Sequence, residues 1–275
     1  MRRFNPRRLL LFPLLLALLA VYIHWGNTSL VLTEITVEDA DIPAPFSGFR
    51  IAHISDLHNT QFSPDNSRLL ALLAQSHPDI IVLTGDIIDA HHTNAPVAAH
   101  FVEQAQSIAP VYYVTGNHES GNREAYATVK AAAEQCGALM LNTAAVTLER
   151  GGASITLAGL HDLGFDSLED QLVLLSPDMT GYTILLAHRP ERIGIYAGAG
   201  ADLVFSGHAH GGQFRLPFVG GLLSPGQGFF PTYDAGLYHF QDTQLVVSRG
   251  LGNSSFPIRL NNRPEIILVQ LQKSA

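Results

Sequence analysis

Cysteine is almost absent from this chain, whose 275 residues include only Cys136. A single thiol cannot close an intrachain disulfide or build a cluster of thiolate metal ligands, so both are excluded. Cys136 stands near the end of an expected helix, where we interpret it as a small packing residue. Histidine is numerous by contrast, with 13 residues, and this favours imidazole chemistry.

Charge is also scarce, since charged residues make up 15% of the chain and hydrophobic residues 47%. This composition supports a large core and excludes an intrinsically disordered chain. Four of the 16 basic residues and none of the acidic ones precede residue 26, so the formal net charge of −8 becomes −12 for residues 26–275. An acidic body binds a phosphate backbone poorly. Nucleic acid is therefore disfavoured as a partner, and a nuclease is disfavoured as a function.

The four early basic residues, Arg2, Arg3, Arg7 and Arg8, precede an uncharged apolar run over residues 9–25. As a helix this run would reach about 25 Å, a little short of a bilayer core of about 30 Å. We interpret residues 1–25 as a signal-anchor helix, with a cleaved signal peptide or a buried core helix as the alternatives. The arginines would stay in the cytoplasm, which places the remainder of the chain on the far side of the membrane.

Strand-like and helix-like segments alternate along the rest of the chain. Residues 26–48 read as a tether that becomes a first strand, and residues 49–275 as the main domain. Strands are expected over residues 29–38, 49–55, 79–86, 110–117, 153–160, 182–188, 201–207, 243–250 and 264–271, and helices over 63–77, 95–109 and 123–137. The alternation in the first half predicts parallel βαβ units. The denser strands of the second half predict a second sheet packed on the first.

Polar side chains that can bind metals follow five of these strands. They are Asp56 and His58, Asp86, Asn117 and His118, His188, and finally His208 and His210. Each alone would pass for a turn, a solvated pair or a buried histidine. Ligands of open α/β sheets bind at the carboxyl ends of strands, so we expect the five groups to meet in one site.

The donor set consists of carboxylates, an amide oxygen and imidazoles, which together suit Mn, Fe, Zn or Co. Seven such side chains exceed what one ion needs beside water and substrate, so two divalent ions sharing a carboxylate fit better. Two adjacent ions can clamp the attacking and leaving oxygens of a displacement at phosphorus.

The ordered series D-x-H (Asp56, His58), GD (Asp86), GNH (Asn117, His118), H (His188) and GHxH (His208, His210) resembles the calcineurin-like metallophosphoesterases. The match begins at Phe49 and continues to the C-terminus. The blocks ISDLH and GHAHGGQ are similar to those of small bacterial membrane-associated or exported phosphoesterases. The resemblance implies an α/β fold, a four-layer αββα sandwich, preceded here by the N-terminal hydrophobic anchor. It also implies a dinuclear centre at the strand ends.

By the same resemblance, Asp56, His58 and His210 would hold the first metal, and Asn117, His188 and His208 the second, with Asp86 bridging the two. Mn, Zn or Fe would occupy both positions. His118 would be the catalytic histidine that protonates the leaving group or stabilises charge at phosphorus. The implied reaction is phosphoester hydrolysis by a metal-bridging hydroxide. The favoured substrate is a phosphodiester, with a lipid-linked one among the candidates.

Two other functions stay open. A pyrophosphatase of a UDP-linked acylated sugar would act in the cytoplasm, which conflicts with the orientation that the arginines predict. The second is a non-catalytic, membrane-tethered metal-binding scaffold. Such a protein would not need the complete set of metal-binding residues, and in particular would not need His118. The expected location is the bacterial cytoplasmic membrane, with a single N-terminal anchor and an extracytoplasmic catalytic domain.

The segment after the GHxH block, residues 211–231, is apolar and rich in glycine and proline. In one interpretation it forms a lip that contacts an acyl chain, with Arg215 binding the substrate phosphate. In the other, its phenylalanines pack under a long loop and Arg215 forms a salt bridge. Both interpretations follow from the sequence, and Arg215 is our candidate substrate-binding residue.

Overall fold

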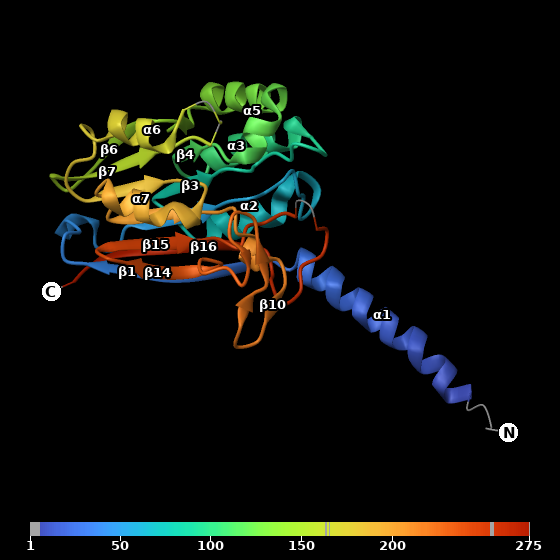
Figure 1. Cartoon of the computed structure of the whole chain (residues 1–275). Helices are drawn as coiled ribbons and strands as arrows, with labels where there is room; N and C mark the ends of the chain where they lie inside the picture. The colour runs from blue at the N-terminus through green and yellow to red at the C-terminus, as the bar shows by residue number, and fades with distance from the viewer. Residues whose placement is uncertain (1–5, 163, 165, 254–255, 275) are drawn as a thin grey trace.

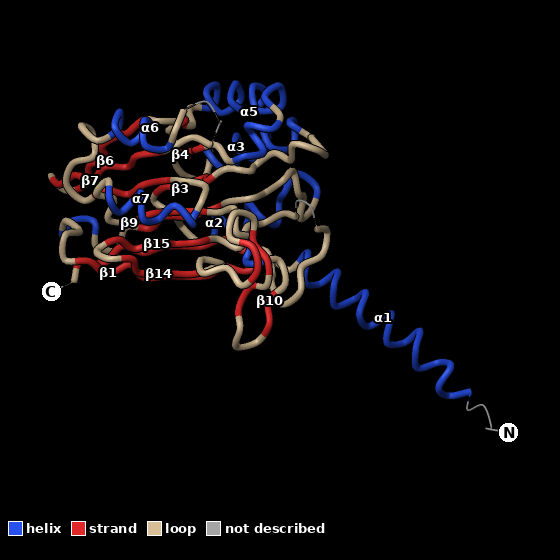
Figure 2. Tube along the Cα trace, in the orientation of Figure 1, coloured by secondary structure: helices blue, strands red, loops and turns tan. Residues whose placement is uncertain are grey.

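Two six-stranded mixed sheets form the centre of the protein in the computed structural model, which describes residues 6–162, 164, 166–253 and 256–274. The first sheet has the order β1 (Val31–Asp39), β16 (Glu265–Lys273), β2 (Arg50–Ile54), β3 (Ile80–Thr84), β4 (Val111–Val114) and β5 (Leu139–Met140). The second has the order β14 (Gly236–Phe240), β15 (Thr243–Val247), β9 (Leu203–Ser206), β8 (Thr183–Leu186), β7 (Ala153–Gly159) and β6 (Ala144–Arg150). The strands of both sheets run across the view in Figure 1, and Figure 2 distinguishes them from the helices by colour.

Side chains that alternate along the strands separate the core into three apolar layers. In β3, Leu83 packs on the side covered by helices α2 (Ser67–Gln75), α3 (Ala95–Gln106) and α5 (Arg123–Cys136), whereas Val82 packs between the sheets. In β9, Phe205 packs between the sheets and Val204 packs toward helices α6 (Leu168–Leu175) and α7 (Ile193–Gly198). Each such side chain contributes about 1.5–3 kcal/mol by burial. The layers therefore follow the order αββα, as expected.

The first half folds as the predicted parallel βαβ units, since β2, β3 and β4 pair in parallel. Helix α5 begins where the Asn122 side chain accepts a hydrogen bond from the backbone N–H of Ala125, and it ends at Gly137, which has a φ of 88°. Cys136 is the last residue of this helix, as predicted. Helix α2 begins at Ser67 rather than at residue 63 of the predicted helix, because Asp65 and Asn66 adopt left-handed backbone angles.

The second half differs from the expectation at its last strand. β16 does not join the second sheet but lies in the first sheet, between β1 and β2. It pairs in parallel with β1 and antiparallel with β2. Strands β6 and β14 and helix α6 also add to the elements that the sequence predicted. The first strand predicted from the sequence, β1, is thus an edge strand of the first sheet, where it pairs with β16 from the other end of the chain.

The N-terminal helix α1 (Pro6–Thr28) projects from the body (Figure 1). Its end is seated on the domain, because Asn27 accepts a hydrogen bond from Asn253 at 2.8 Å and Arg263 lies over the ring of Trp25. Within the described residues, no helix combines the length and apolar character needed to cross a bilayer. The predicted membrane-spanning anchor is therefore not supported, and Arg2 and Arg3 of that prediction lie outside the described residues.

Candidate metal centre

All five polar groups predicted from the sequence meet in one place, but they come from two sheets rather than one. The segments after β2 and β3 of the first sheet supply Asp56, His58 and Asp86, and helix α4 (Asn117–Gly121), which follows β4, supplies Asn117 and His118. The loops after β8 and β9 of the second sheet supply His188, His208 and His210. All of these side chains are buried except that of Asn117, which is half-buried. The site therefore joins the carboxyl ends of strands across the sandwich.

The histidines and aspartates form three overlapping groups whose nearest nitrogen and oxygen atoms lie within 4.8 Å of one another. The groups are Asp56, His58 and His210; His58, Asp86 and His118; and Asp86, His188 and His208. In the first group the Nε2 atoms of His58 and His210 are 3.2 Å apart. In the third group Nδ1 of His208 lies 3.1 Å from Nε2 of His188. Asn117 joins this group, with its Oδ1 3.2 Å from the same nitrogen.

Asp86 lies between the two outer groups. Its Oδ2 is 3.8 Å from Nε2 of His58 and 3.3 Å from Nε2 of His188. Its Oδ1 accepts a hydrogen bond from the backbone N–H of His118 at 2.8 Å. The first and third groups bring together the side chains that the family resemblance assigns to the two metal positions, and Asp86 lies where a bridging carboxylate would be needed.

The backbone at the candidate ligands is strained. Asp56, His58, Asp86, His208 and His210 have φ values between 47° and 64°, in the left-handed region. This conformation costs an L-residue roughly 1–2 kcal/mol, and it persists only where surrounding structure enforces it. The conformation that turns five of the seven candidate ligands toward a common centre therefore lowers the stability of the fold.

Two motif glycines are needed for close approach rather than for an unusual backbone angle. A Cβ atom on Gly207 would lie 1.8 Å from Oγ of Ser55, and one on Gly116 would lie 2.3 Å from Oδ1 of Asp86. Both distances are impossible for non-bonded atoms. Gly207 thus lets the loops of the two sheets touch at the site, and Gly116 lets the segments after β3 and β4 of the first sheet touch there.

Burial and neighbouring charges shift the pKa values of the groups in the centre in different directions. Burial favours the neutral ring of His188, but the adjacent Asp86 carboxylate outweighs burial and raises the pKa of His188 to about 10. Burial lowers the pKa of His58 to about 4 and that of His208 to about 2. Burial also raises the pKa of Asp56 to about 7. His58 and His208 are thus neutral near pH 7 and have lone pairs to offer.

The residues fit divalent ions by their hydrogen bonds as well as by their charge. Nδ1 of His188 lies 2.7 Å from the carbonyl oxygen of Thr84, to which it can donate, and this leaves Nε2 directed at Asp86. Such a bond selects the tautomer that a metal needs. Two neutral imidazoles facing each other at 3.2 Å, as His58 and His210 do, share at most one proton. An ion bound by both rings would lie between their lone pairs and remove the need for a shared proton. An ion beside Asp86 would take the place of the proton of His188.

Comparison with known proteins agrees with this geometry. The model of the calcineurin-like phosphoesterase family matches residues 49–212, which include every candidate ligand and His118. The chain belongs to the calcineurin-like phosphoesterase family. Its relatives include the uncharacterized metallophosphoesterase YkuE of Bacillus subtilis (strain 168), which is 33% identical over 88% of this chain and 85% of its own.

A phosphodiesterase and a solved structure are also similar to this phosphoesterase. The phosphodiesterase YaeI of Escherichia coli (strain K12) is 28% identical over 81% of this chain and 82% of its own. Among solved structures, the protein TT1561 of Thermus thermophilus superposes with a TM-score of 0.50, over 74% of this chain and 91% of that protein, at 14% identity. The last similarity supports the fold alone. Family membership makes the chain a metallophosphoesterase and therefore a hydrolase.

A backbone N–H group of a neighbouring loop orients the His118 ring of the phosphoesterase. The backbone N–H of Ala90 donates to its Nδ1 at 2.9 Å. An acceptor Nδ1 places the proton of the neutral ring on Nε2. This Nε2 lies 4.0 Å from Oδ2 of Asp86, at the edge of the candidate metal positions. His118 is therefore directed at the site as a donor.

Glu119 is a residue of the site that reasoning from sequence missed. Its buried carboxylate accepts hydrogen bonds from the backbone N–H groups of Asp86 at 2.8 Å, Ile87 at 2.9 Å and Gly116 at 2.7 Å. The hydroxyl of Tyr113 also donates to it at 2.8 Å. Glu119 thus holds the Asp86 and Asn117 loops together. The only clue in the sequence is its place directly after GNH.

A cavity of about 360 Å³, which we call the main cavity, opens onto the candidate metal positions. Its walls combine polar and apolar groups, namely Asp86, Asn117, His118, His208, His210, Gln213, Leu223, Ser224, Pro225 and Phe256. Arg215, the predicted substrate-binding residue, is not among them. Its guanidinium lies 2.9 Å from Oδ2 of Asp234 and donates to the carbonyl oxygen of Gly211 at 2.9 Å. The structure therefore places Arg215 in the salt bridge that was the alternative interpretation.

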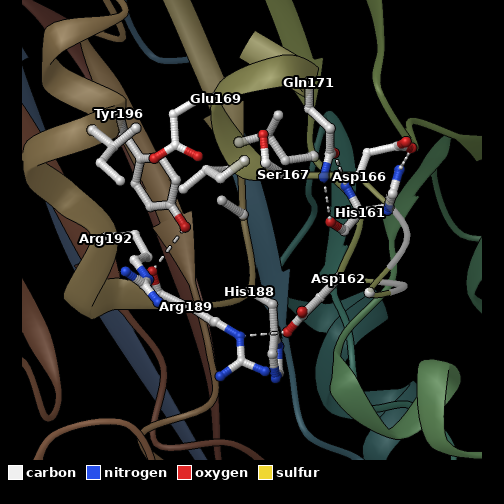
Figure 3. A pocket seen from close by; sticks show the side chains of 15 residues that line it. His161, Asp162, Asp166, Ser167, Glu169, Gln171, His188, Arg189, Arg192 and Tyr196 are labelled. Carbon is white, nitrogen blue, oxygen red and sulfur yellow. Dashed lines mark hydrogen bonds and ion pairs between the residues drawn. The ribbon is translucent and has the colours of Figure 1, made fainter.

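A second cavity of about 280 Å³ adjoins the centre at His188 (Figure 3). Arg189 borders it, with its Nη1 3.4 Å from Nε2 of His208 and its Nε donating to Asp162 at 2.6 Å. Tyr196 donates to the backbone oxygen of Arg189 at 2.9 Å. Arg189 is thus a cation beside the site that the sequence analysis did not single out, and Asp162 neutralises much of its charge.

Proposed function

We propose that this metallophosphoesterase hydrolyses phosphodiesters, with two divalent ions held by the seven candidate ligands and His118 as the proton donor. The observation that carries the proposal is the position of Asp86 between two groups of imidazoles, with Nε2 of His118 at their edge. When bound, two ions would acidify a water molecule and neutralise charge on the phosphoryl oxygens. Mn, Zn and Fe all suit these donors.

The roles of the side chains in this proposal follow from their hydrogen bonds. His118 donates through Nε2, because its Nδ1 already accepts from Ala90. A donor at this place can pass a proton to the oxygen that leaves phosphorus. Thr84 orients His188, and the backbone N–H of His208 donates to both oxygens of Asp56 at 3.1 Å. These contacts hold the candidate ligands before a substrate arrives.

The charge of the main cavity favours a diester over a monoester. A phosphodiester carries a single negative charge, whereas a monoester carries up to two and is usually met by Arg or Lys. The described residues that line this cavity include no Arg or Lys. Leu223, Pro225 and Phe256 instead line it beside the candidate ligands. We propose that one esterified group of the substrate is apolar and rests on these residues, as in a lipid-linked phosphodiester. The name of the relative YaeI, a phosphodiesterase, agrees with the proposed reaction.

The test is hydrolysis of bis-p-nitrophenyl phosphate and of p-nitrophenyl phosphate by the full chain, first stripped of metal and then supplied with Mn²⁺ or Zn²⁺. We expect metal-dependent turnover that is faster with the diester. Asp86→Asn should lose roughly 10³-fold or more, because loss of the ions removes several kcal/mol of transition-state stabilisation. Asp178→Asn, at an exposed turn after α6, is the matched control and should keep full activity.

Two results would contradict the proposal. Faster turnover of the monoester would reverse the assigned substrate class. No turnover of either ester, with two ions bound per chain, would favour the pyrophosphatase or the non-catalytic scaffold. The extracytoplasmic location of the catalytic domain stays a prediction from the four N-terminal arginines.

A further inference from the structure

Several exposed apolar side chains gather on two short hairpins beside the main cavity. One hairpin joins β10 (Arg215–Leu216) to β11 (Gly220–Gly221), and the other joins β12 (Leu223–Ser224) to β13 (Gly228–Phe229). We call the exposed side chains of Leu216, Phe218, Val219, Phe229, Phe230 and the nearby Phe256 the apolar rim. Phe218 is fully exposed, and Phe229 and Phe230 are 76% and 65% exposed.

The exposed phenylalanines at the tip of the first hairpin and at the base of the second do not pack onto the body, although phenylalanine normally would. Phe218 and Phe230 have φ values of 67° and 55°, in the left-handed region that bulky residues rarely adopt. Their exposure also costs free energy in water. The segment 216–231 contains no charged residue. An exposed, strained and uncharged surface of this kind indicates a contact that the isolated chain lacks.

The N-terminal helix α1 is linked to the base of the first hairpin by hydrogen bonds through Asn261. Tyr22 of α1 donates to the side-chain oxygen of Asn261, and Asn261 donates to the backbone oxygen of Arg215 at the base of the first hairpin. Figure 1 shows α1 and this hairpin projecting from the same side of the body. Over residues 12–21 every side chain of α1 is exposed, and none is polar. A groove in a partner protein would cover one face of such a helix, whereas lipid covers all of them.

We propose that the apolar rim inserts into the surface of a lipid bilayer. The projecting first hairpin suits insertion among lipid chains better than a flat protein interface, and the exposed apolar residues 12–21 of α1 can lie in the same apolar phase without crossing it. The bilayer is thus the one occupant that accounts for both projecting elements.

This orientation has a consequence for the substrate, which rests on the proposed function. Leu223, Pro225 and Phe256 belong to the hairpin region and also line the cavity at the candidate ligands. With the rim inserted, the mouth of this cavity lies at the level of the headgroups. A phosphodiester linked to a lipid would reach the site from the membrane, with its phosphate at the ions and its chains in the bilayer.

The direct test places a tryptophan at the rim. Trp25 is the single tryptophan of the chain, so Trp25→Phe combined with Phe218→Trp reports from the hairpin tip alone. With vesicles of phosphatidylethanolamine and phosphatidylglycerol, we expect its fluorescence to be quenched by lipids brominated on their acyl chains. Val173→Trp in the same background is the matched control, since Val173 is 72% exposed on α6, away from the rim, and should not be quenched.

A second measurement separates the rim from α1. Phe218→Ser with Phe229→Ser should weaken vesicle binding of the full chain by roughly tenfold for each phenylalanine removed. Val173→Ser with Leu174→Ser, at two exposed positions of α6, should leave binding unchanged. Neither Phe218 nor Phe229 lines the main cavity, so hydrolysis of bis-p-nitrophenyl phosphate in solution should stay at the level of the unchanged chain.

The outcomes distinguish this inference from the proposed function. Unquenched fluorescence of the F218W chain while that chain sediments with vesicles would overturn membrane insertion of the rim. Self-association that the serine variants abolish, without quenching, would assign the rim to a second copy and overturn it as well. Absence of diester hydrolysis in solution would contradict the proposed function and leave the quenching result to decide on the membrane.

Discussion

His118 shows how one side chain of the centre can be separated from the others. It lies beside Asp86 but outside the two outer groups of candidate ligands. His118→Gln should therefore keep both metals and lower kcat by roughly 10²–10⁴-fold, the usual contribution of general acid catalysis. The loss should be larger for an alkyl leaving group than for p-nitrophenol, which departs readily without a proton.

The control for this prediction is His92→Gln, because the His92 side chain on the neighbouring loop is highly exposed. Its rate and metal content should match those of the unchanged chain. Full activity of His118→Gln, or an equal loss for both leaving groups, would show that His118 is not the proton donor. Loss of metal in this variant would make it a ligand instead.

His53 tests a second property of single residues, the cost of a buried histidine in acid. Its Nε2 lies 2.8 Å from Oγ1 of Thr84, and burial lowers its pKa from 6.5 to about 3. Between these values the unfolded chain binds a proton at this position and the folded chain does not. Stability should therefore fall as the pH falls from 6.5 toward 3, by about 1.4 kcal/mol per pH unit from this residue.

The measurement is the free energy of unfolding in urea at several pH values, for the metal-free chain and for His53→Gln. Glutamine can keep the bond to Thr84 and does not titrate, so its curve should be flatter by this slope. His100→Gln, at a half-exposed position on α3, should follow the unchanged chain. Parallel curves for all three proteins would contradict the lowered pKa of His53.

At the level of elements, Glu119 links the segments of the centre that follow β3 and β4. Its two oxygens accept four backbone hydrogen bonds and one from Tyr113. Glu119→Gln keeps one oxygen and turns an amide toward backbone donors. We expect a loss of roughly 2–4 kcal/mol of stability and weaker metal binding, because several buried N–H groups lose their acceptor.

Thermal unfolding and metal titration would check this prediction against two other variants. Tyr113→Phe removes one of the five bonds and should cost about 1 kcal/mol. Glu124→Gln, exposed in the first turn of α5, should cost nothing measurable. A Glu119→Gln chain as stable as the Glu124→Gln chain would show that the carboxylate does not hold these loops.

The elements also show which parts of the structure the sequence predicts. The strand ends that carry Asp86 and His188 follow short apolar runs, so local pattern was enough to place them. The place of β16 between β1 and β2 depends on pairing between the two ends of the chain, which no local pattern reports. Glu119 was missed for a related reason. Three of its five partners, the backbone N–H groups of residues 86–88, come from a segment more than 30 residues away, and only the fold brings them to this carboxylate.

At the scale of the whole molecule, each candidate metal position takes ligands from both sheets. His210 of the second sheet meets Asp56 and His58 of the first, and Asp86 of the first meets His188 and His208 of the second. The left-handed backbones of the ligands lower the stability of the metal-free fold. Bound ions would therefore link the two halves of the sandwich and offset that cost.

Metal binding should accordingly raise the melting temperature of the chain. An ion that binds only the folded state contributes about 2.7 kcal/mol at about 100 times its Kd. For a domain of this size that corresponds to roughly 5–10 °C for each site, measured by calorimetry with Mn²⁺ added to the stripped chain. Asp86→Asn should lose most of the shift at both sites, whereas His118→Gln should retain all of it. An equal shift in Asp86→Asn would mean that the ions bind elsewhere and that the two sheets are not joined through this carboxylate.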